Sequence, residues 1–322
     1  MGLEIKHIIV FLLAIVPALI WIYLFLRKKH QNKWLILFVF MGGMVAAKLI
    51  LVYQGYWDET INLVFFKVDP IDFRENIKNI FSNSPILALF LSFVGVGIME
   101  EFLKFWIMKL IGSRFFQSID DVIELAIISA LGFAYYENVV YFTSQWGSLS
   151  VSSFAIFAMF RVTIVTMVHI LCSGLLGYYF GMAFFSTQMM QVEYLKKKTH
   201  PILDFLKRIL HLRKDRVFRN EMIAIGLLSA MVLHAIYDFV LTINVNIVGV
   251  PLHVPIMLIY FFGGFWYLKK LLKRKDLALK LGLIGTAVMP KEDYEKIMTE
   301  VSEAEEKMKK RPRISRTKSK II

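Results

Sequence analysis

Long apolar runs, separated by shorter polar connections, follow one another along most of the chain. Many approach the roughly 20 residues that a helix needs to cross a bilayer. The seven runs of this length are Ile8–Leu26, Trp34–Val52, Pro85–Ile111, Val122–Phe142, Phe154–Phe185, Met222–Leu241 and Pro251–Leu268. The pattern predicts an all-α, polytopic integral membrane protein with seven transmembrane helices. No small-residue cleavage site follows the first run, so we expect a retained helix and not a signal peptide.

The distribution of positive charge predicts the orientation of these helices. Lys and Arg are concentrated in alternate connections: four lie in 27–33, nine in 187–220 and sixteen from Lys269 onward, against three in 53–84. By the positive-inside rule, the N-terminus lies outside and the C-terminus in the cytoplasm of a multi-pass plasma-membrane protein. The formal net charge of +13 therefore indicates topology and attraction of the basic cytoplasmic segments to anionic lipids, not binding of nucleic acid.

The same pattern divides the chain into a membrane domain, 1–272, and a cytoplasmic tail, 273–322. Within the membrane domain, the polar motifs fall in a core of 85–241, and 187–220 is predicted to be a basic cytoplasmic loop. In the tail, apolar residues recur at helical spacing over 291–310, which predicts an amphipathic helix. The basic end after it is predicted to be disordered.

Several ionisable side chains lie inside runs that otherwise prefer hydrocarbon. Each costs about 3 kcal/mol on insertion scales, so each needs a cavity or a partner. They are Glu100, Glu101 and Lys104 in the third run, Glu137 in the fourth, Arg161 and His169 in the fifth, and His234 and Asp238 in the sixth. Such a set is too costly to retain for packing alone, so it predicts a functional polar centre. The pattern does not identify the carboxylate that Arg161 needs.

Helical spacing links some of these side chains. Glu100 and Lys104 are four residues apart, with the acid first, so they share one helix face. His234 and Asp238 have the same spacing, which lets the carboxylate hold the imidazole in one orientation. Taken alone, His169 is as consistent with packing as with function.

Carboxylates and imidazoles in this combination support two routes to hydrolysis. They can bind a divalent metal that activates water, with one glutamate left free as general base. Without a metal, a glutamate and a histidine can activate water directly, while another histidine and a carboxylate stabilise the developing oxyanion. The same residues could instead serve a proton- or cation-coupled transporter, or the chain could be a non-catalytic membrane adaptor. Residue types alone leave these alternatives open.

Position along each run provides a test of a single centre. Counted from Pro85, Glu100 lies about 22 Å along its helix at 1.5 Å per residue, whereas Glu137 lies about 8 Å from the outer end of its run. Tilted or broken helices would bring the two to one level. A structure that separates Glu100 from Glu137 and His234 by a membrane leaflet would exclude a shared site.

Four short motifs follow one another on successive runs. They are Glu100-Glu101-x-x-Lys104, Gly132-Phe133-Ala134-x-x-Glu137-Asn138 within LGFAYYENVVYF, His169 in a run that ends Gly177-Tyr178-Tyr179-Phe180-Gly181, and His234-x-x-x-Asp238. Their order and placement, between Pro85 and Leu241, resemble the PrsW family of intramembrane proteases. The resemblance implies a polytopic membrane endopeptidase, distantly similar to the CaaX prenyl endopeptidases. Its substrate would be a membrane-anchored protein such as an anti-sigma factor, cut within or just outside the membrane.

The resemblance also implies roles for the polar residues. Glu100 or Glu101 is expected as general base, with Lys104 as the cation that tunes it. Asp238 is expected to orient His234. The metal ligands expected are Glu101, Glu137, His169 and His234. The family implies zinc or another divalent metal, whereas the CaaX relatives imply a metal-free glutamate mechanism; no small-molecule cofactor is expected.

Overall fold

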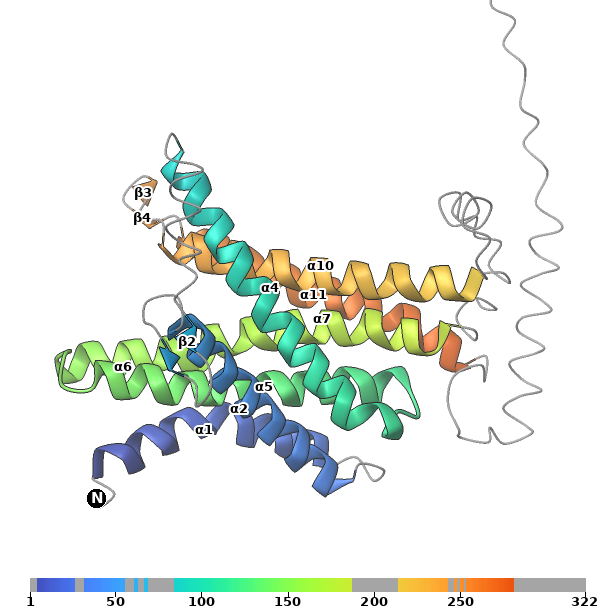
Figure 1. Ribbon diagram of the computed structural model, residues 1–322, viewed down its shortest axis with the longest axis horizontal. Helices are drawn as coiled ribbons and strands as arrows, with labels where there is room; N and C mark the ends of the chain where they lie inside the picture. The colour runs from blue at the N-terminus through green and yellow to red at the C-terminus, as the bar shows by residue number, and fades with distance from the viewer. Residues whose placement is uncertain are drawn as a thin grey trace, which may run out of the picture.

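Helices make up nearly all of the described chain (Figure 1). The computed structural model describes residues 5–26, 32–55, 61–62, 67–68, 84–186, 214–242, 246–247, 250–251 and 253–280. Within these ranges, sheet structure is limited to two antiparallel pairs of two-residue strands: β1 (Ile61–Asn62) with β2 (Lys67–Val68), and β3 (Asn246–Ile247) with β4 (Val250–Pro251). The all-α class predicted from the apolar runs is confirmed.

Six of the described helical segments are long and apolar enough to cross a membrane. The helices are α1 (Ile5–Leu26), α2 (Lys33–Gly55), α4 (Pro85–Gly112), α5 (Ile119–Gln145), α6 (Val151–Phe160), α7 (Thr166–Phe184), α10 (Lys214–Thr242) and α11 (His253–Lys280). A short 3-10 helix, η1 (Ser113–Phe115), follows α4. The six spans correspond to the first six predicted runs, so a multi-pass membrane protein is confirmed. The seventh run lies in α11, which is not among the six, and the count of seven and the orientation stay predictions.

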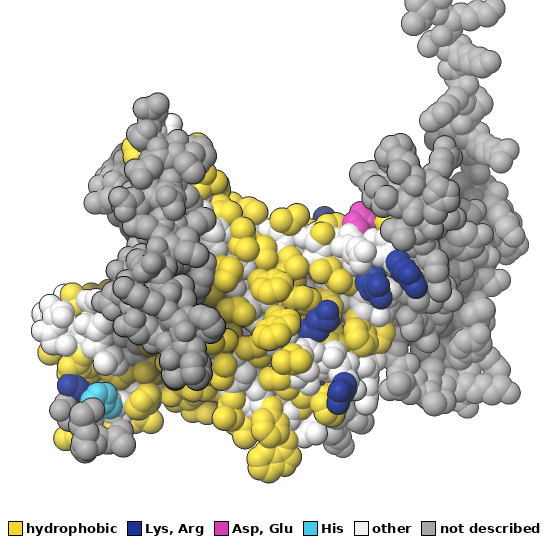
Figure 2. Space-filling view, in the orientation of Figure 1, with side chains coloured by type: hydrophobic (Ala, Val, Ile, Leu, Met, Phe, Trp, Pro, Cys, Tyr) yellow, Lys and Arg dark blue, Asp and Glu magenta, His cyan; other side chains and the backbone are white. Residues whose placement is uncertain are grey.

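Hydrophobic side chains cover most of the visible described surface, as expected for helices that face lipid. Figure 2 shows this apolar face, with Lys and Arg side chains gathered toward the end where α10 begins. Individual apolar residues are highly exposed, including Leu110 on α4 and Ile259 on α11. In water such a surface would be unfavourable, whereas in a bilayer it contacts acyl chains.

Polar capping residues fix where some of the helices begin. α5 starts with a capping box in which Asp121 Oδ2 accepts the Ser118 N–H at 2.8 Å and Ser118 Oγ accepts the Asp121 N–H at 3.2 Å. α4 begins at Pro85, which needs no hydrogen-bond acceptor for its own nitrogen. The capping box thus fixes the start of α5 after the turn that follows α4, and Pro85 marks the start of α4.

The fifth predicted run is one span with a change of helix type inside it. α6 and α7 are joined by a π-helical turn, η2, at Arg161–Val165, and the whole span runs from Val151 to Phe184. The Thr166 hydroxyl donates to the Arg161 carbonyl at 3.2 Å across this turn. A π turn widens the helix locally and alters the direction of the side chains it carries. Arg161 therefore stands at the point where this span is irregular.

Four helices, α1, α2, α4 and α7, contact α5, whereas α10 packs against α7 and α4. Gly177 and Gly181 of α7 face α5 so closely that a Cβ at Gly177 would lie 2.9 Å from Ala126 Cβ, and one at Gly181 would lie 2.8 Å from Ile119 Cγ2. The Gly177-x-x-x-Gly181 spacing is therefore a helix contact. It holds α7, which carries His169, against α5, which carries Glu137.

Two helices continue across predicted boundaries, which themselves stay predictions. α10 begins at Lys214, inside the predicted loop 187–220, and α11 continues to Lys280, inside the predicted tail 273–322. The extension of α10 is rich in Lys and Arg, and that of α11 in Lys, Arg and Leu; these residues favour helix, so both helices continue beyond their apolar windows. The predicted amphipathic helix over 291–310 and the basic end lie outside the described residues.

Candidate active site

α4 supplies a buried cluster of opposite charges. Glu101 and Lys104 are 0% and 1% exposed, and Glu100 is 7% exposed. Lys104 Nζ lies 2.8 Å from Glu101 Oε1 and 3.5 Å from Glu100 Oε2, as their three- and four-residue separations allow. The ammonium also lies over the Phe133 ring, 4.0 Å from its centroid. Lys104 is therefore held by two acids and an aromatic face.

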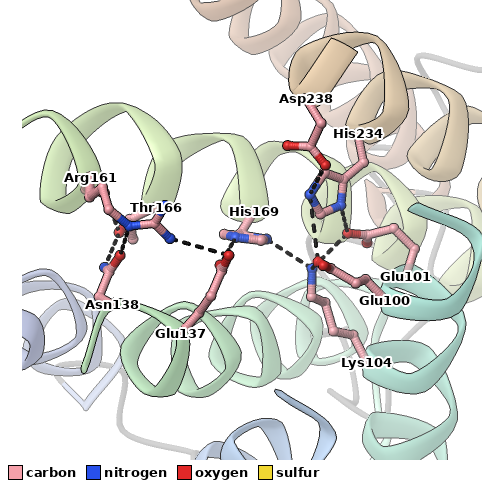
Figure 3. Close-up of polar contacts among 10 residues, drawn as sticks. All are labelled: Glu100, Glu101, Lys104, Glu137, Asn138, Arg161, Thr166, His169, His234 and Asp238. Atoms are coloured by element: carbon pink, nitrogen blue, oxygen red, sulfur yellow. Dashed lines mark hydrogen bonds and ion pairs between the residues drawn. The ribbon is translucent and has the colours of Figure 1, made fainter. Parts of the chain in front are cut away.

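α10 brings His234 against both of these acids (Figure 3). Its Nδ1 lies 2.8 Å from Glu101 Oε1, and its Nε2 lies 3.6 Å from Glu100 Oε2 and 3.7 Å from Asp238 Oδ2. With Glu101 ionised, its oxygens only accept, so Nδ1 carries a hydrogen and Nε2 is directed at Glu100. The expected contact of Asp238 with His234 is present, but Glu101 is the closer orienting carboxylate.

His169 of α7 joins the α4 cluster to α5. Its Nδ1 lies 2.8 Å from Lys104 Nζ, and its Nε2 lies 3.0 Å from Glu137 Oε2. The ammonium donates to Nδ1, and Nε2 therefore donates to the Glu137 carboxylate. The ring of His169 meets that of His234 edge to face, with centroids 5.0 Å apart. The two histidines thus lie next to each other at the centre of the constellation.

Arg161 lies on the π turn, and the sequence pattern identified no partner for it. Its NH2 nitrogen lies 3.2 Å from Glu137 Oε1, and its Nε donates to Asn138 Oδ1 at 3.0 Å (Figure 3). Its guanidinium also lies over the Tyr141 ring, 3.7 Å from the centroid. Arg161 therefore fixes Glu137 from the side opposite His169. The cost of a cation inside a membrane indicated that a partner must exist, but not which one.

These side chains surround one cavity of about 250 Å³. Five of the seven predicted site residues line it: Glu100, Glu137, His169, His234 and Asp238. Glu101 and Lys104 lie behind that lining. Arg161 and Tyr237 also line the cavity, and no pattern had identified Tyr237. It is an aromatic residue on an apolar helix, where aromatic residues are ordinary, so only its position in the fold marks it.

Glu100 and Glu137 were predicted to lie at different depths along their helices, yet both line the same cavity. α4 crosses α7 and α10 obliquely (Figure 1), so residues at different heights along their own helices reach the same cavity. The contact between Glu100 and His234 at 3.6 Å shows that no membrane leaflet lies between them. Among these described residues, Glu100 is therefore not separated from Glu137 and His234 by a leaflet, and a shared site is not excluded.

Three of the lining residues bring metal-ligating atoms together. Glu100, His169 and His234 each offer one donor atom, and these atoms lie within 4.8 Å of one another. Glu100 Oε2 is buried and has no hydrogen-bond partner among the described residues. Two imidazoles and one carboxylate are a ligand set that hydrolytic zinc sites use. The residues therefore fit a divalent metal.

The charge of the cluster agrees with this fit. With every carboxylate ionised and both histidines neutral, four acids face two permanent cations, which leaves a formal charge of −2. The acids are Glu100, Glu101, Glu137 and Asp238, and the cations are Lys104 and Arg161. A divalent cation would balance this charge in surroundings where unbalanced charge is costly.

Glu101 and Glu137, which were also expected as metal ligands, contact the histidines instead. Glu101 bonds to Nδ1 of His234 and Glu137 to Nε2 of His169. Carboxylates commonly hold ligating imidazoles in this way. Because both nitrogens of His169 are engaged, ligation by His169 would displace either Lys104 or Glu137 from the ring.

Comparison with known proteins identifies the family. The profile described as "PrsW family intramembrane metalloprotease" matches residues 31–199, just over half of the chain. This chain belongs to the PrsW family. Protease PrsW of Clostridioides difficile (strain 630) is 26% identical over 240 residues, covering 73% of this chain and 79% of that protein. No solved structure matches.

Membership of the PrsW family makes this protein a membrane-embedded peptidase. The matched range begins just before α2, a helix that carries none of the four motifs. The range includes Glu100, Glu137 and His169. His234 and Asp238 of α10 lie beyond it, yet the fold brings them to the same cavity. The geometry therefore adds α10 to the site that the family profile covers.

Proposed function

We propose that this protein is an intramembrane endopeptidase that hydrolyses a peptide bond of a membrane-anchored protein, within or just outside the membrane. The observation that supports this most is the cavity at which Glu100, His169 and His234 gather their donor atoms inside a helical bundle. Hydrolysis there needs water next to an activating centre, and a cavity of about 250 Å³ has room for several water molecules.

We propose that Glu100, His169 and His234 hold a zinc ion. A bound divalent metal would act as a Lewis acid on the scissile carbonyl and would acidify a water molecule. The protein's own groups prepare this site: Glu101 holds His234 by Nδ1, so that Nε2 is directed toward Glu100. Lys104 keeps two buried carboxylates compensated.

The choice of general base follows from access to the cavity. Glu101 does not line the cavity, and its Oε1 contacts both Lys104 and His234, so it does not meet water in the cavity directly. Glu137 is engaged by Arg161 on one oxygen and by His169 on the other. The Asp238 side chain is 24% exposed and is contacted by His234 only at 3.7 Å. We therefore propose Asp238 as the group that accepts the proton of the attacking water, if Glu100 serves as a ligand.

The substrate we propose is a membrane protein with a short extracytoplasmic domain, of the anti-sigma-factor kind. The proposal rests on the family and on apolar residues of α2 and α4 that line the cavity, among them Ile50, Leu51 and Phe93. These side chains suit the hydrophobic residues of a membrane anchor. We also propose a plasma-membrane location, with anionic lipids bound at the basic cytoplasmic segments.

The first test identifies cleavage products and metal together. Membranes producing the wild type, Glu100→Gln or His234→Ala are compared by sequencing newly formed protein N-termini, and the purified proteins by elemental mass spectrometry. We expect new N-termini near membrane anchors with the wild type only, and about one zinc per chain that both variants lose. Equal products in all three samples would contradict the peptidase site. Cleavage without metal would favour the glutamate mechanism.

A further inference from the structure

One tyrosine in the cavity takes no part in the contacts described above. Tyr237 lies on α10 between His234 and Asp238, and it lines the same cavity. The residue is only 4% exposed. Within the described residues, its hydroxyl is buried without a hydrogen-bond partner. Burial of a phenol in this way costs free energy, because the hydroxyl has lost its hydrogen bonds to water and gained no partner. An unpartnered buried group of this kind therefore calls for an explanation.

The surroundings of the ring hold this hydroxyl in place. The Tyr237 ring packs against that of Tyr260, with centroids 6.3 Å apart, and it borders a small apolar pocket with Met257 and Phe261. Tyr237 follows His234 by three residues, so the two side chains project from the same side of α10. The phenol is therefore carried by a rigid helix on the side that bears the proposed ligand.

The charged and imidazole donors of the site are already engaged. Lys104 contacts two carboxylates and an imidazole, and Arg161 contacts Glu137 and Asn138. Nδ1 of His234 is occupied by Glu101. Tyr237 differs from these groups in being neutral, buried and unpartnered within the part of the chain that the structure describes. A fixed donor of this kind can stabilise charge that develops during a reaction, since it needs no reorganisation when the charge appears.

We propose that Tyr237 donates a hydrogen bond to the carbonyl oxygen of the scissile peptide bond as that oxygen becomes an alkoxide. In this step the oxygen of water bonds to the carbonyl carbon, and the proton of water passes to a carboxylate in the cavity. The π pair moves onto the carbonyl oxygen, which Tyr237 contacts. The carbonyl then re-forms, the C–N bond breaks, and the amine leaves with that proton. This inference rests on the proposed peptidase function.

Removing only the hydroxyl tests this role. Tyr237→Phe keeps the ring packing, and Tyr260→Phe is the matched control, because the Tyr260 hydroxyl contacts Cys172 Sγ at 3.9 Å instead of the cavity. The probe is a fluorogenic peptide that spans a cleavage site mapped for the wild type. In Tyr237→Phe we expect kcat to fall about 100-fold with KM changed less than threefold, and in Tyr260→Phe we expect nearly wild-type kinetics.

Two further readouts separate this role from a structural one. Zinc content should be unchanged and the thermal midpoint should not fall in Tyr237→Phe, because the hydroxyl holds neither a ligand nor a neighbouring group and its burial without a partner costs free energy. A kcat within threefold of the wild type, a change in KM alone, or an equal fall in Tyr260→Phe would overturn the inference. If the wild type itself cleaves nothing, the proposed function fails instead, and the two failures are distinguished.

Discussion

At the scale of single residues, adjacent acids on α4 have different surroundings. Glu100 lines the cavity, whereas Glu101 has no exposed surface and lies between Lys104 and His234. Successive residues of a helix are about 100° apart around its axis, since 3.6 residues make one turn. One carboxylate therefore faces the cavity, and its neighbour contacts the groups behind the lining.

This division predicts a specific effect of Glu101→Gln. The amide keeps the size of the side chain but gives up the charge that holds His234 Nδ1, so we expect zinc affinity to fall about 10- to 100-fold. The measurement is a chelator competition titration on the purified protein. Glu221→Gln is the control. Glu221 lies on α10 with His234, but near the beginning of the helix, whereas His234 lies nearer its end. Unchanged zinc affinity in Glu101→Gln would show that the contact has no part in holding a metal.

At the scale of helices, close packing decides which polar residues meet. Glycines on α7 bring this helix against α5, and the π turn before α7 carries Arg161 to Glu137. The contact between His169 and Glu137 depends on both features. Helix contacts in the bilayer rest on close van der Waals packing, so a single added methyl group at the narrowest point is felt at the site.

Gly177→Ala tests this coupling between packing and site. Its Cβ would lie 2.9 Å from both Ala126 Cβ and Ile123 Cα, so backbone must move. We expect a loss of roughly 1–3 kcal/mol of stability and reduced cleavage. Gly263→Ala is the matched control, because a Cβ there meets no described atom within 4 Å. Thermal unfolding in detergent measures the first effect, and equal thermal midpoints for the two variants would contradict it.

At the scale of the whole molecule, the membrane fixes the direction from which a substrate arrives. Charge counts predict that the α4–α5 connection is cytoplasmic and the α5–α6 connection is outside. The structure supports the helices but holds no membrane, so orientation remains a prediction. It decides whether the extracytoplasmic domain of a substrate can reach the cavity.

Labelling of introduced cysteines measures this orientation. In a Cys172→Ala background, Arg114→Cys lies in the α4–α5 connection and Ser148→Cys in the α5–α6 connection. An impermeant thiol reagent applied to intact cells should modify Ser148→Cys and leave Arg114→Cys until the membrane is permeabilised. The reverse pattern would place the N-terminus inside and would remove the support for an extracytoplasmic cleavage site.

The helical class, six of the spans and the types of residue in the candidate site could all be predicted from the amino-acid sequence. Apolar length is read directly along the chain, and ionisable residues inside such lengths are costly enough to predict a shared centre. The motifs also indicated the family that the comparison confirmed. All of these features are local, or depend only on the order of residues.

Which of those residues line the cavity, and which contact the lining residues from behind, depends on the tertiary structure. His234 lies 133 positions from Glu101, and the rotation and tilt of each helix set which side chain faces the cavity. These depend on glycine contacts and on the π turn, which apolar periodicity does not specify. For this reason the partner of Arg161 and the place of Tyr237 became visible only in the fold. The same holds for the grouping of Glu100, and not Glu101, with the two imidazoles as a possible ligand set. Side-chain chemistry follows from sequence, whereas proximity follows from packing.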